Sequence, residues 1–138
     1  MKKYLLILFM VCLAITACSS GSKSASIVGT WKLTAYGPAN SPTPAVSDVD
    51  ASITFDVNGT LNGNGGCNSM SGDYIVDGNQ ITFGPIMSTL MGCYEPRMTQ
   101  EGTVHQVLTD TASFKIDDNT LTILNKDMVL VFALVAAE

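Results

Sequence analysis

Only a few side chains in this sequence are of the types that catalyse reactions or hold metals. His105 is the single histidine, and Cys67 and Cys93 are the cysteines nearest to it in the chain. A Cys–His pair can form a nucleophile, but a disulfide between the cysteines would leave no thiolate for that role. These residues also do not provide the four ligands of a zinc site. We therefore predict no catalytic residue, no metal and no cofactor.

Two acidic pairs could in principle supply a general acid and a general base. They are Asp48 with Asp50, and Asp117 with Asp118. Both pairs lie beside turn-forming residues, so we interpret them as solvated acids of turns. The sequence also lacks a nucleophile elbow, a phosphate-binding loop and a zinc-protease motif. The chain is therefore not predicted to be an enzyme.

The N-terminal residues have the organisation of a secretory signal. Lys2 and Lys3 precede an apolar run over Tyr4–Leu13. This run is shorter than the roughly 20 residues that a helix needs to span a bilayer. We interpret residues 1–17 as a signal peptide that is removed from the mature protein.

The signal ends in Ile15-Thr16-Ala17-Cys18, which resembles a bacterial lipobox. The resemblance implies that Cys18 becomes the acylated N-terminus of a lipoprotein. Several acyl chains give stable anchoring, because each buried CH₂ contributes about 0.8 kcal/mol. The serine-rich remainder of residues 18–26 is predicted to be a flexible tether.

The residue after the acylated cysteine bears on the destination of the protein. Ser19 stands where an Asp often marks inner-membrane retention in lipoproteins of this type. The expected location is therefore the cell envelope, at the outer membrane and facing the periplasm. Without residues 1–17 the chain has five basic and twelve acidic residues, a formal charge of −7. Such a charge opposes binding to nucleic acid and to anionic lipid, so the acyl chains must hold the protein to the membrane.

Two cysteines remain once Cys12 has left with the signal and Cys18 is acylated. In an oxidising compartment, Cys67 and Cys93 most simply form one disulfide. Closing a loop of about 26 residues would stabilise the fold by roughly 3.5 kcal/mol in the chain-entropy description. A pair of buried free thiols is the alternative.

Beyond the tether, short alternating runs are separated by Gly, Asn and Asp, which indicates strands joined by tight turns. Asn58-Gly59 favours a type I′ hairpin turn, and the three prolines of Gly37–Ser47 predict a loop. The runs that predict strands are 31–36, 52–57, 60–62, 73–76, 80–83, 113–116, 120–124 and 128–135. The last run is nearly all apolar, which favours a central strand or one covered on both faces.

One segment departs from this alternation. Pro96 suits the first turn of a helix, and Val104, Val107 and Leu108 could form its buried stripe. We predict a helix within 95–110. The predicted fold is mainly β (α+β): a single compact antiparallel β-sheet, strongly curled or barrel-like, with one short helix over one opening.

The densest cluster of glycines is Gly63-Asn64-Gly65-Gly66-Cys67-Asn68. Backbone N–H groups in such a segment can cradle a phosphate, but no helix start or lysine accompanies them here. We prefer a bulged corner that brings Cys67 to Cys93. Tyr74, Phe83 and Tyr94 are expected near this corner, as core residues rather than as the wall of a groove.

Two long segments resemble a known family. Gly66-Cys67-Asn68-Ser69-Met70-Ser71-Gly72-Asp73-Tyr74 is similar to the segment G-C-N-x-[YF]-S-G-x-Y of the META domain family, also called HslJ-like. Phe83-Gly84-Pro85-Ile86-Met87-Ser88-Thr89-Leu90-Met91-Gly92-Cys93 resembles the second segment, F-G-P-[IML]-A-[ST]-T-[RK]-M-A-C. The positions that carry the resemblance are Gly66, Cys67, Asn68, Ser71, Gly72, Tyr74, Phe83, Gly84, Pro85, Thr89, Met91 and Cys93. The domain is predicted over 27–138.

Three positions depart from the family pattern. Met70 stands where an aromatic is usual, Met87 where Ala is usual, and Leu90 where Arg or Lys is usual. A partner contact made by that cation is therefore not open to this chain. We expect Met70 and Leu90 to form a softer apolar patch beside the cysteines.

The resemblance implies a compact β-rich domain associated with heat shock and antibiotic tolerance, and it supplies no catalytic residues. We expect a lipid-anchored, non-enzymatic envelope protein that binds a protein or another envelope component under stress. One alternative is a lipocalin-like carrier of a small apolar ligand, because a closed barrel can hold a ligand if its interior is not filled. The other is a periplasmic inhibitor of a lysozyme or protease.

Overall fold

The structure is a computed structural model that describes residues 26–136. The predicted signal peptide, Cys18 and all but the last residue of the tether lie outside the described residues. Among residues 26–136 there is no helix with the length and apolar character to cross a membrane. The described elements are β1 (Gly29–Pro38), β2 (Thr43–Pro44), β3 (Ser52–Phe55), β4 (Thr60–Asn64), β5 (Ser69–Asp77), β6 (Gln80–Phe83), β7 (Met87–Ser88), α1 (Arg97–Val107), β8 (Thr111–Asp117), β9 (Thr120–Asn125) and β10 (Met128–Leu134).

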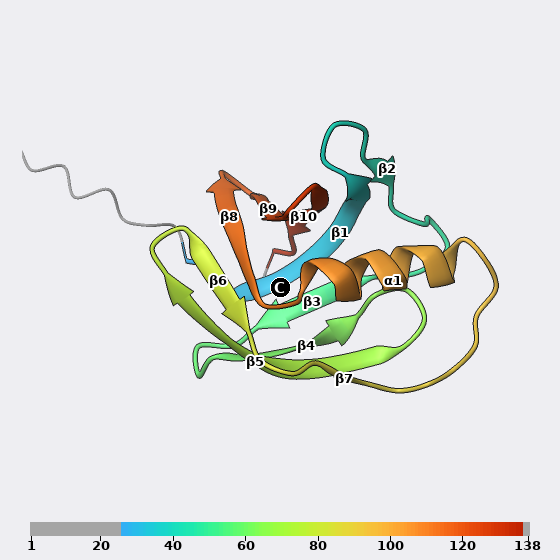
Figure 1. Cartoon of the computed structure of the whole chain (residues 1–138), viewed down its shortest axis with the longest axis horizontal. Coiled ribbons are helices and arrows are strands. Elements are labelled where there is room, and N and C mark those ends of the chain that lie inside the picture. Colours follow the sequence, from blue (N-terminus) through green and yellow to red (C-terminus); the bar gives the residue numbers. More distant parts are fainter. Residues whose placement is uncertain (1–25, 137–138) are drawn as a thin grey trace, which may run out of the picture.

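Eight of the strands form a closed antiparallel barrel (Figure 1). The order around it is β1-β3-β4-β5-β6-β8-β9-β10, and β10 pairs back with β1. The closing register runs from Trp31 opposite Leu134 to Pro38 opposite Met128. The predicted curled or closed antiparallel sheet is therefore confirmed, and β10 is a central strand with a partner on each side.

Two short strands add to this barrel. β7 pairs with Met70 and Ser71 of β5. β2 pairs with Ala35 and Tyr36 of β1, inside the segment that its prolines predicted to be a loop. A strand of two residues has no alternating pattern to reveal it, and Pro44 is tolerated because it lies at the sheet edge.

The turn after β3 also differs from the prediction. Gly59 has a positive φ of 81°, whereas Asn58 does not, so the turn is not type I′. The Asp56 carboxylate instead accepts hydrogen bonds from the Asn58 backbone N–H and from Asn58 Nδ2, at 2.8 and 2.7 Å. This side-chain capping of the turn favours the ordinary right-handed conformation at Asn58.

Alternation along the strands sends one set of side chains into the barrel. The largest that are fully buried on the strands are Trp31, Ile53, Phe55, Leu61, Ile81, Leu121, Ile123, Leu130 and Phe132, and Leu108 at the C-terminal end of α1 is buried with them. Each such side chain stabilises the fold by about 1.5–3 kcal/mol relative to an exposed position. Trp31 also donates its indole N–H to the carbonyl of Ile27 at 2.7 Å, so its polar atom is satisfied inside the core.

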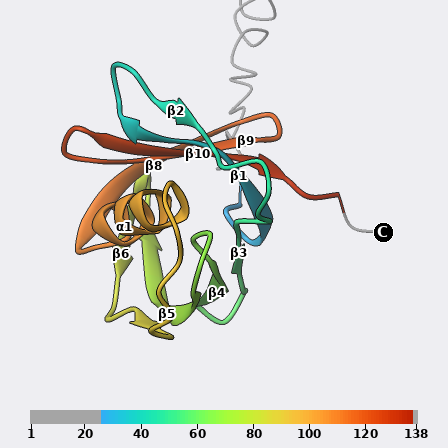
Figure 2. The same ribbon diagram turned by 90° about the vertical axis from the view of Figure 1, so that its right-hand side faces the viewer.

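Helix α1 lies within the curl of the sheet, below β1, β9 and β10 (Figure 2). It was predicted within 95–110 and spans Arg97–Val107. Its buried residues are Gln100, Glu101, Thr103, Val104 and Val107. The helix thus places two strongly polar side chains inside the barrel.

Candidate functional site

The Cys67–Cys93 disulfide is present, which confirms the predicted pairing. The two Cα atoms are 6.0 Å apart and 26 residues apart in sequence. The bond joins the loop between β4 and β5 to the loop between β7 and α1. This disulfide and the hydrogen bonds of Asn68, Gln100 and Glu101 hold the two loops to α1, and we call them together the clamp.

Asn68 is the polar centre of the same clamp and is 3% exposed. Its Oδ1 accepts hydrogen bonds from Thr89 Oγ1 at 2.9 Å and from the Met91 N–H at 2.7 Å. Its Nδ2 donates to the Met91 carbonyl at 3.1 Å and to Glu101 at 2.7 Å. All four hydrogen-bonding positions of the amide are therefore used, which fixes the loop after β7 against the loop before β5.

Glu101 holds these loops to the helix and is 5% exposed. Its carboxylate accepts the backbone N–H groups of Cys67 and Asn68, at 3.0 and 2.5 Å, in addition to Asn68 Nδ2. A carboxylate that accepts several hydrogen bonds can be buried without an opposite charge beside it. The backbone N–H groups that a bound phosphate would need are thus occupied by a side chain of the protein.

Gln100 adds a second link from the helix and is completely buried. Its Nε2 donates to the Gly65 carbonyl at 2.8 Å, and its Oε1 accepts the Val46 N–H at 2.7 Å. Gly66 has φ of +127°, and a Cβ there would lie 2.6 Å from Gln100 Nε2. The glycine cluster is therefore a tight structural corner, as predicted.

Neither Gln100 nor Glu101 was predicted to be part of the site. They continue the helical spacing of the predicted buried stripe of Val104, Val107 and Leu108. A polar residue on such a stripe must be buried with partners, and this signal could have identified both. Their partners were not identifiable, because they lie more than 30 residues away in sequence.

The remaining family positions mostly serve packing. Tyr74 and Phe83 are core residues opposite each other on β5 and β6, as predicted. The Tyr74 ring packs edge-to-face on Phe55, with centroids 5.1 Å apart, and its hydroxyl donates to the Asp56 carbonyl at 2.8 Å. Burial, with a smaller contribution from the negative charge of Asp56, raises the pKa of Tyr74. A Cβ on Gly72 would lie 2.8 Å from Ile86 Cδ1, so β5 and the Phe83-Gly84-Pro85 segment meet closely there.

Two predictions about this region are wrong. Tyr94 was expected in the core, but it is 93% exposed. Met70 was expected to share an apolar patch with Leu90, but it is buried, with its methyl group directed towards Gly65. Met70 follows the alternation of β5 into the barrel, whereas the segment after β7 lies on the surface, so its apolar side chains are left in solvent.

Exposed apolar residues occur along the chain from β7 to the first turn of α1. We define the apolar strip as Met87, Leu90, Met91, Tyr94 and Met98, of which Leu90 is 98% exposed. The backbone under it is held by the Asn68 contacts, by the Thr89 N–H to the Ser69 carbonyl at 3.1 Å, and by the disulfide. The strip is thus both apolar and fixed in position.

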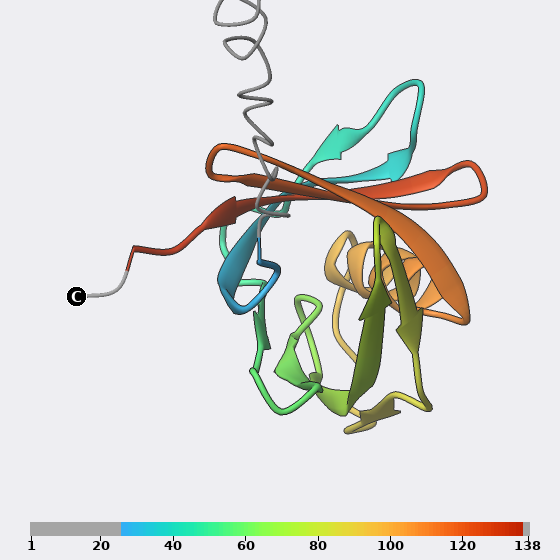
Figure 3. The same ribbon diagram turned by 90° about the vertical axis from the view of Figure 1, so that its left-hand side faces the viewer.

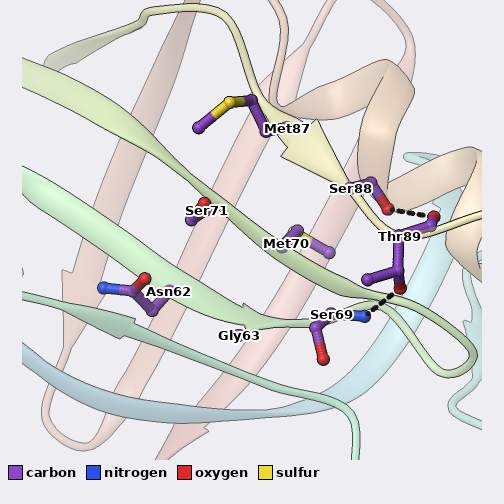
Figure 4. A pocket seen from close by; sticks show the side chains of 8 residues that line it. All are labelled: Asn62, Gly63, Ser69, Met70, Ser71, Met87, Ser88 and Thr89. Carbon is purple, nitrogen blue, oxygen red and sulfur yellow. Dashed lines mark hydrogen bonds between the residues drawn. The ribbon is translucent and has the colours of Figure 1, made fainter.

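A shallow groove of about 520 Å³ adjoins the strip across β4, β5 and β7 (Figure 4). Its lining side chains are mostly small and polar, and Met87 links it to the apolar strip. Thr89 Oγ1 accepts the Ser69 N–H at 3.2 Å, and Ser88 Oγ donates to the Thr89 carbonyl at 3.0 Å. The lining residues are Asn62, Gly63, Ser69, Met70, Ser71, Met87, Ser88 and Thr89.

Three of the four acidic residues considered in the sequence form ion pairs with basic side chains, and Asp118 lies in a turn with a positive φ of 50°. Asp48 binds Arg97 at 2.6 Å, and the hydrogen bond from that guanidinium lowers the pKa of Asp48. Asp50 binds Lys32 and Asp117 binds Lys115, each at 3.0 Å. Within residues 26–136, no cluster of three or more His, Cys, Asp or Glu side chains is placed to hold a metal ion. The polar chemistry described above holds the fold together.

These features define a small antiparallel β-barrel domain that is filled by one helix and clamped at one corner by a disulfide and a buried polar network. The META domain family model matches residues 25–137, and the chain belongs to this family. No curated protein matches the chain significantly.

Two solved structures share the fold. A protein from Burkholderia xenovorans studied by NMR has a TM-score of 0.66 and 22% identity, over 79% of this chain and 83% of that one. A crystal structure of a DUF4847 family protein from Bacteroides vulgatus has a TM-score of 0.59 and 18% identity, over 80% of this chain and 94% of that one. Identities this low show a common architecture and do not transfer a function.

Proposed function

We propose that this META domain protein is a non-enzymatic envelope lipoprotein that binds a protein partner through the apolar strip. In this proposal Cys18 carries the lipid, and the domain faces the periplasm from the outer membrane. The lipobox-like end of the signal and Ser19 support the location. The acidic charge argues against nucleic acid as the partner.

The observation that carries the proposal is an exposed apolar strip on a fixed backbone. Methionine and tyrosine are enriched at protein interfaces, and large apolar side chains gathered on a surface indicate a binding site. Because Asn68 and the disulfide hold the backbone of the strip, little backbone conformational entropy remains to be lost when a partner binds. Leu90, in place of the family's usual cation, makes the contact apolar rather than electrostatic.

A carrier of a small apolar ligand is less well supported. The interior of the barrel is occupied by large side chains and by α1. The hollows found among residues 26–136 open to solvent at the surface, although buried side chains such as Leu61 and Leu108 form part of their walls. Native mass spectrometry of the purified protein would reveal a retained ligand.

Site-specific crosslinking in intact cells tests the partner. A photoreactive amino acid replaces Leu90 in the full-length protein, and the matched control carries it at Ile75, which is 72% exposed on the outer face of β5. We expect a discrete protein adduct from position 90 and none of the same mass from position 75. Equal adducts at both positions, or none at position 90 under heat or novobiocin-type stress, would contradict the proposal.

The inhibitor alternative is a special case in which the partner is a hydrolase. The purified protein should then slow a lysozyme or a periplasmic protease at stoichiometric concentration, and Leu90→Asp should remove the effect. Full enzyme activity at a tenfold excess of the protein rules out that hydrolase as the partner.

A further inference from the structure

A second apolar surface lies at the other end of the barrel. The described chain begins there at Ser26, whereas the segment between β7 and α1 is at the opposite end (Figure 1). A hollow of about 410 Å³ at this end is lined by residues that include Ser26, Tyr74 and Phe114. Three valines from separate segments, Val28, Val57 and Val76, complete its apolar wall.

The apolar character of this hollow follows from the barrel itself. Val76 is paired with Ile81 and Phe114 with Ile123, and both isoleucines are completely buried. Paired residues project to the same face of a sheet, so Val76 and Phe114 also face inwards. Both side chains line the hollow, and Figure 3 views the barrel from this end.

The valines are well exposed for apolar residues. Val57 is 79% exposed at the tip of the turn between β3 and β4, and Val28 and Val76 are 42% and 41% exposed. We define the apolar mouth as Val28, Val57 and Val76 with the hollow between them. Because these residues come from three different segments, the mouth is a surface formed by the fold.

The length and polarity of the tether indicate what covers the mouth. Ser26 lies eight positions after Cys18, so the sulfur that would carry the lipid lies within about 30 Å of the mouth even when the tether is fully extended. Residues 19–25 are Ser-Ser-Gly-Ser-Lys-Ser-Ala, which are too polar to fill an apolar hollow. The bilayer is therefore the nearest large apolar phase.

We propose that the apolar mouth rests on the phospholipid bilayer that anchors Cys18. This inference rests on the lipid anchor of the proposed function. Asp56 precedes Val57 and Asp77 follows Val76 at the end of β5, so carboxylates flank the mouth and the contact favours zwitterionic over anionic phospholipid. In this orientation the barrel stands on the membrane, and the apolar strip faces away from it.

Quenching by brominated lipid tests the orientation. The full-length precursor carrying Val57→Trp is expressed, and its lipidated product is reconstituted into phosphatidylcholine–phosphatidylethanolamine vesicles with brominated acyl chains. The matched variant is Leu90→Trp, which places the same probe on the apolar strip. Trp31 is present in both and is only 2% exposed, so the wild-type signal is subtracted.

We expect at least twofold quenching of the residue 57 probe and none at residue 90. Equal quenching at both positions, or stronger quenching at residue 90, overturns the docking proposal while leaving the anchor intact. Failure of the protein to float with the vesicles overturns the anchor and the docking together. A concentration-dependent blue shift at residue 57 without vesicles identifies a second copy as the occupant and also overturns it.

Discussion

The two ends of the barrel are built on different principles. At the clamp end, Asn68 and Glu101 tie two loops to α1 with at least six hydrogen bonds, and the disulfide adds a covalent link. At the mouth end, short turns join the strands and apolar side chains are left in solvent. One small fold thus has a rigid, hydrogen-bonded end and an opposite end where apolar side chains are exposed.

Removing the Glu101 carboxylate should give the largest effect and break the clamp end. Glu101→Ala leaves three buried donors without an acceptor, and we expect a loss of about 3–5 kcal/mol in the free energy of unfolding. Urea denaturation measures it. Gln106→Ala is the control at an exposed polar side chain of the same helix. A loss below 1 kcal/mol for Glu101→Ala would show that the network contributes little.

Opening the disulfide should have the next largest effect. The double variant Cys67→Ser, Cys93→Ser should lose about 3.5 kcal/mol through the larger entropy of the unfolded chain. Hydrogen exchange should rise first at Met91 and neighbouring residues, while amides of the mouth end keep their relative order of protection. Uniform loss of protection at both ends would mean that the disulfide stabilises the whole barrel and not the clamp end in particular.

Two glycines at opposite ends offer a comparison. Gly66 has φ of +127° and Gly78 of +60°, so the backbone term is already larger at Gly66, and a Cβ at Gly66 would also clash with Gln100, whereas nothing lies within 4 Å of one at Gly78. We expect Gly66→Ala to cost about 3 kcal/mol and Gly78→Ala about 1 kcal/mol, which is the backbone term alone. Thermal unfolding of both variants measures the difference, and equal costs would remove the steric argument.

The smallest effects should appear as opposite pH dependences at the two ends. The lowered pKa of Asp48 means that its stabilisation is present above its usual pKa of 3.8 and is lost as the pH falls through the folded-state pKa. The raised pKa of Tyr74 means that its stabilisation is present below pH 10 and is lost as the pH rises through the folded-state pKa.

Single substitutions separate these two dependences. Asp48→Asn should flatten only the acid limb of stability against pH, and Tyr74→Phe only the alkaline limb. Stability followed by circular dichroism across pH 2–11 checks both. Tyr74→Phe should also lose about 1 kcal/mol at neutral pH with the hydrogen bond to Asp56. Unchanged limbs in both variants would contradict the assignments.

The two ends also differ in how well sequence could predict them. Alternating runs such as 52–57 and 120–124 predicted most strands, because a half-buried strand imposes a period of two. The disulfide followed from counting cysteines. The polar network at Glu101 could not be predicted in this way, because it depends on contacts between residues far apart in sequence. Tyr94 was misplaced because its hydrophobicity does not reveal whether a loop folds inwards.

The pairing of β1 with β10 has a consequence for how the fold is completed. Trp31 and Leu134 are partners across almost the whole domain, so the barrel closes through its most distant contact in sequence. Forming such a contact late in folding is expected, since loop-closure entropy must be overcome before the contact forms. Until β10 is in place, β1 and β9 each present an open edge that can pair with another chain. Pairing of β10 with β1 and β9 therefore removes both open edges, and a chain in which β10 is not yet paired is the form most prone to aggregation.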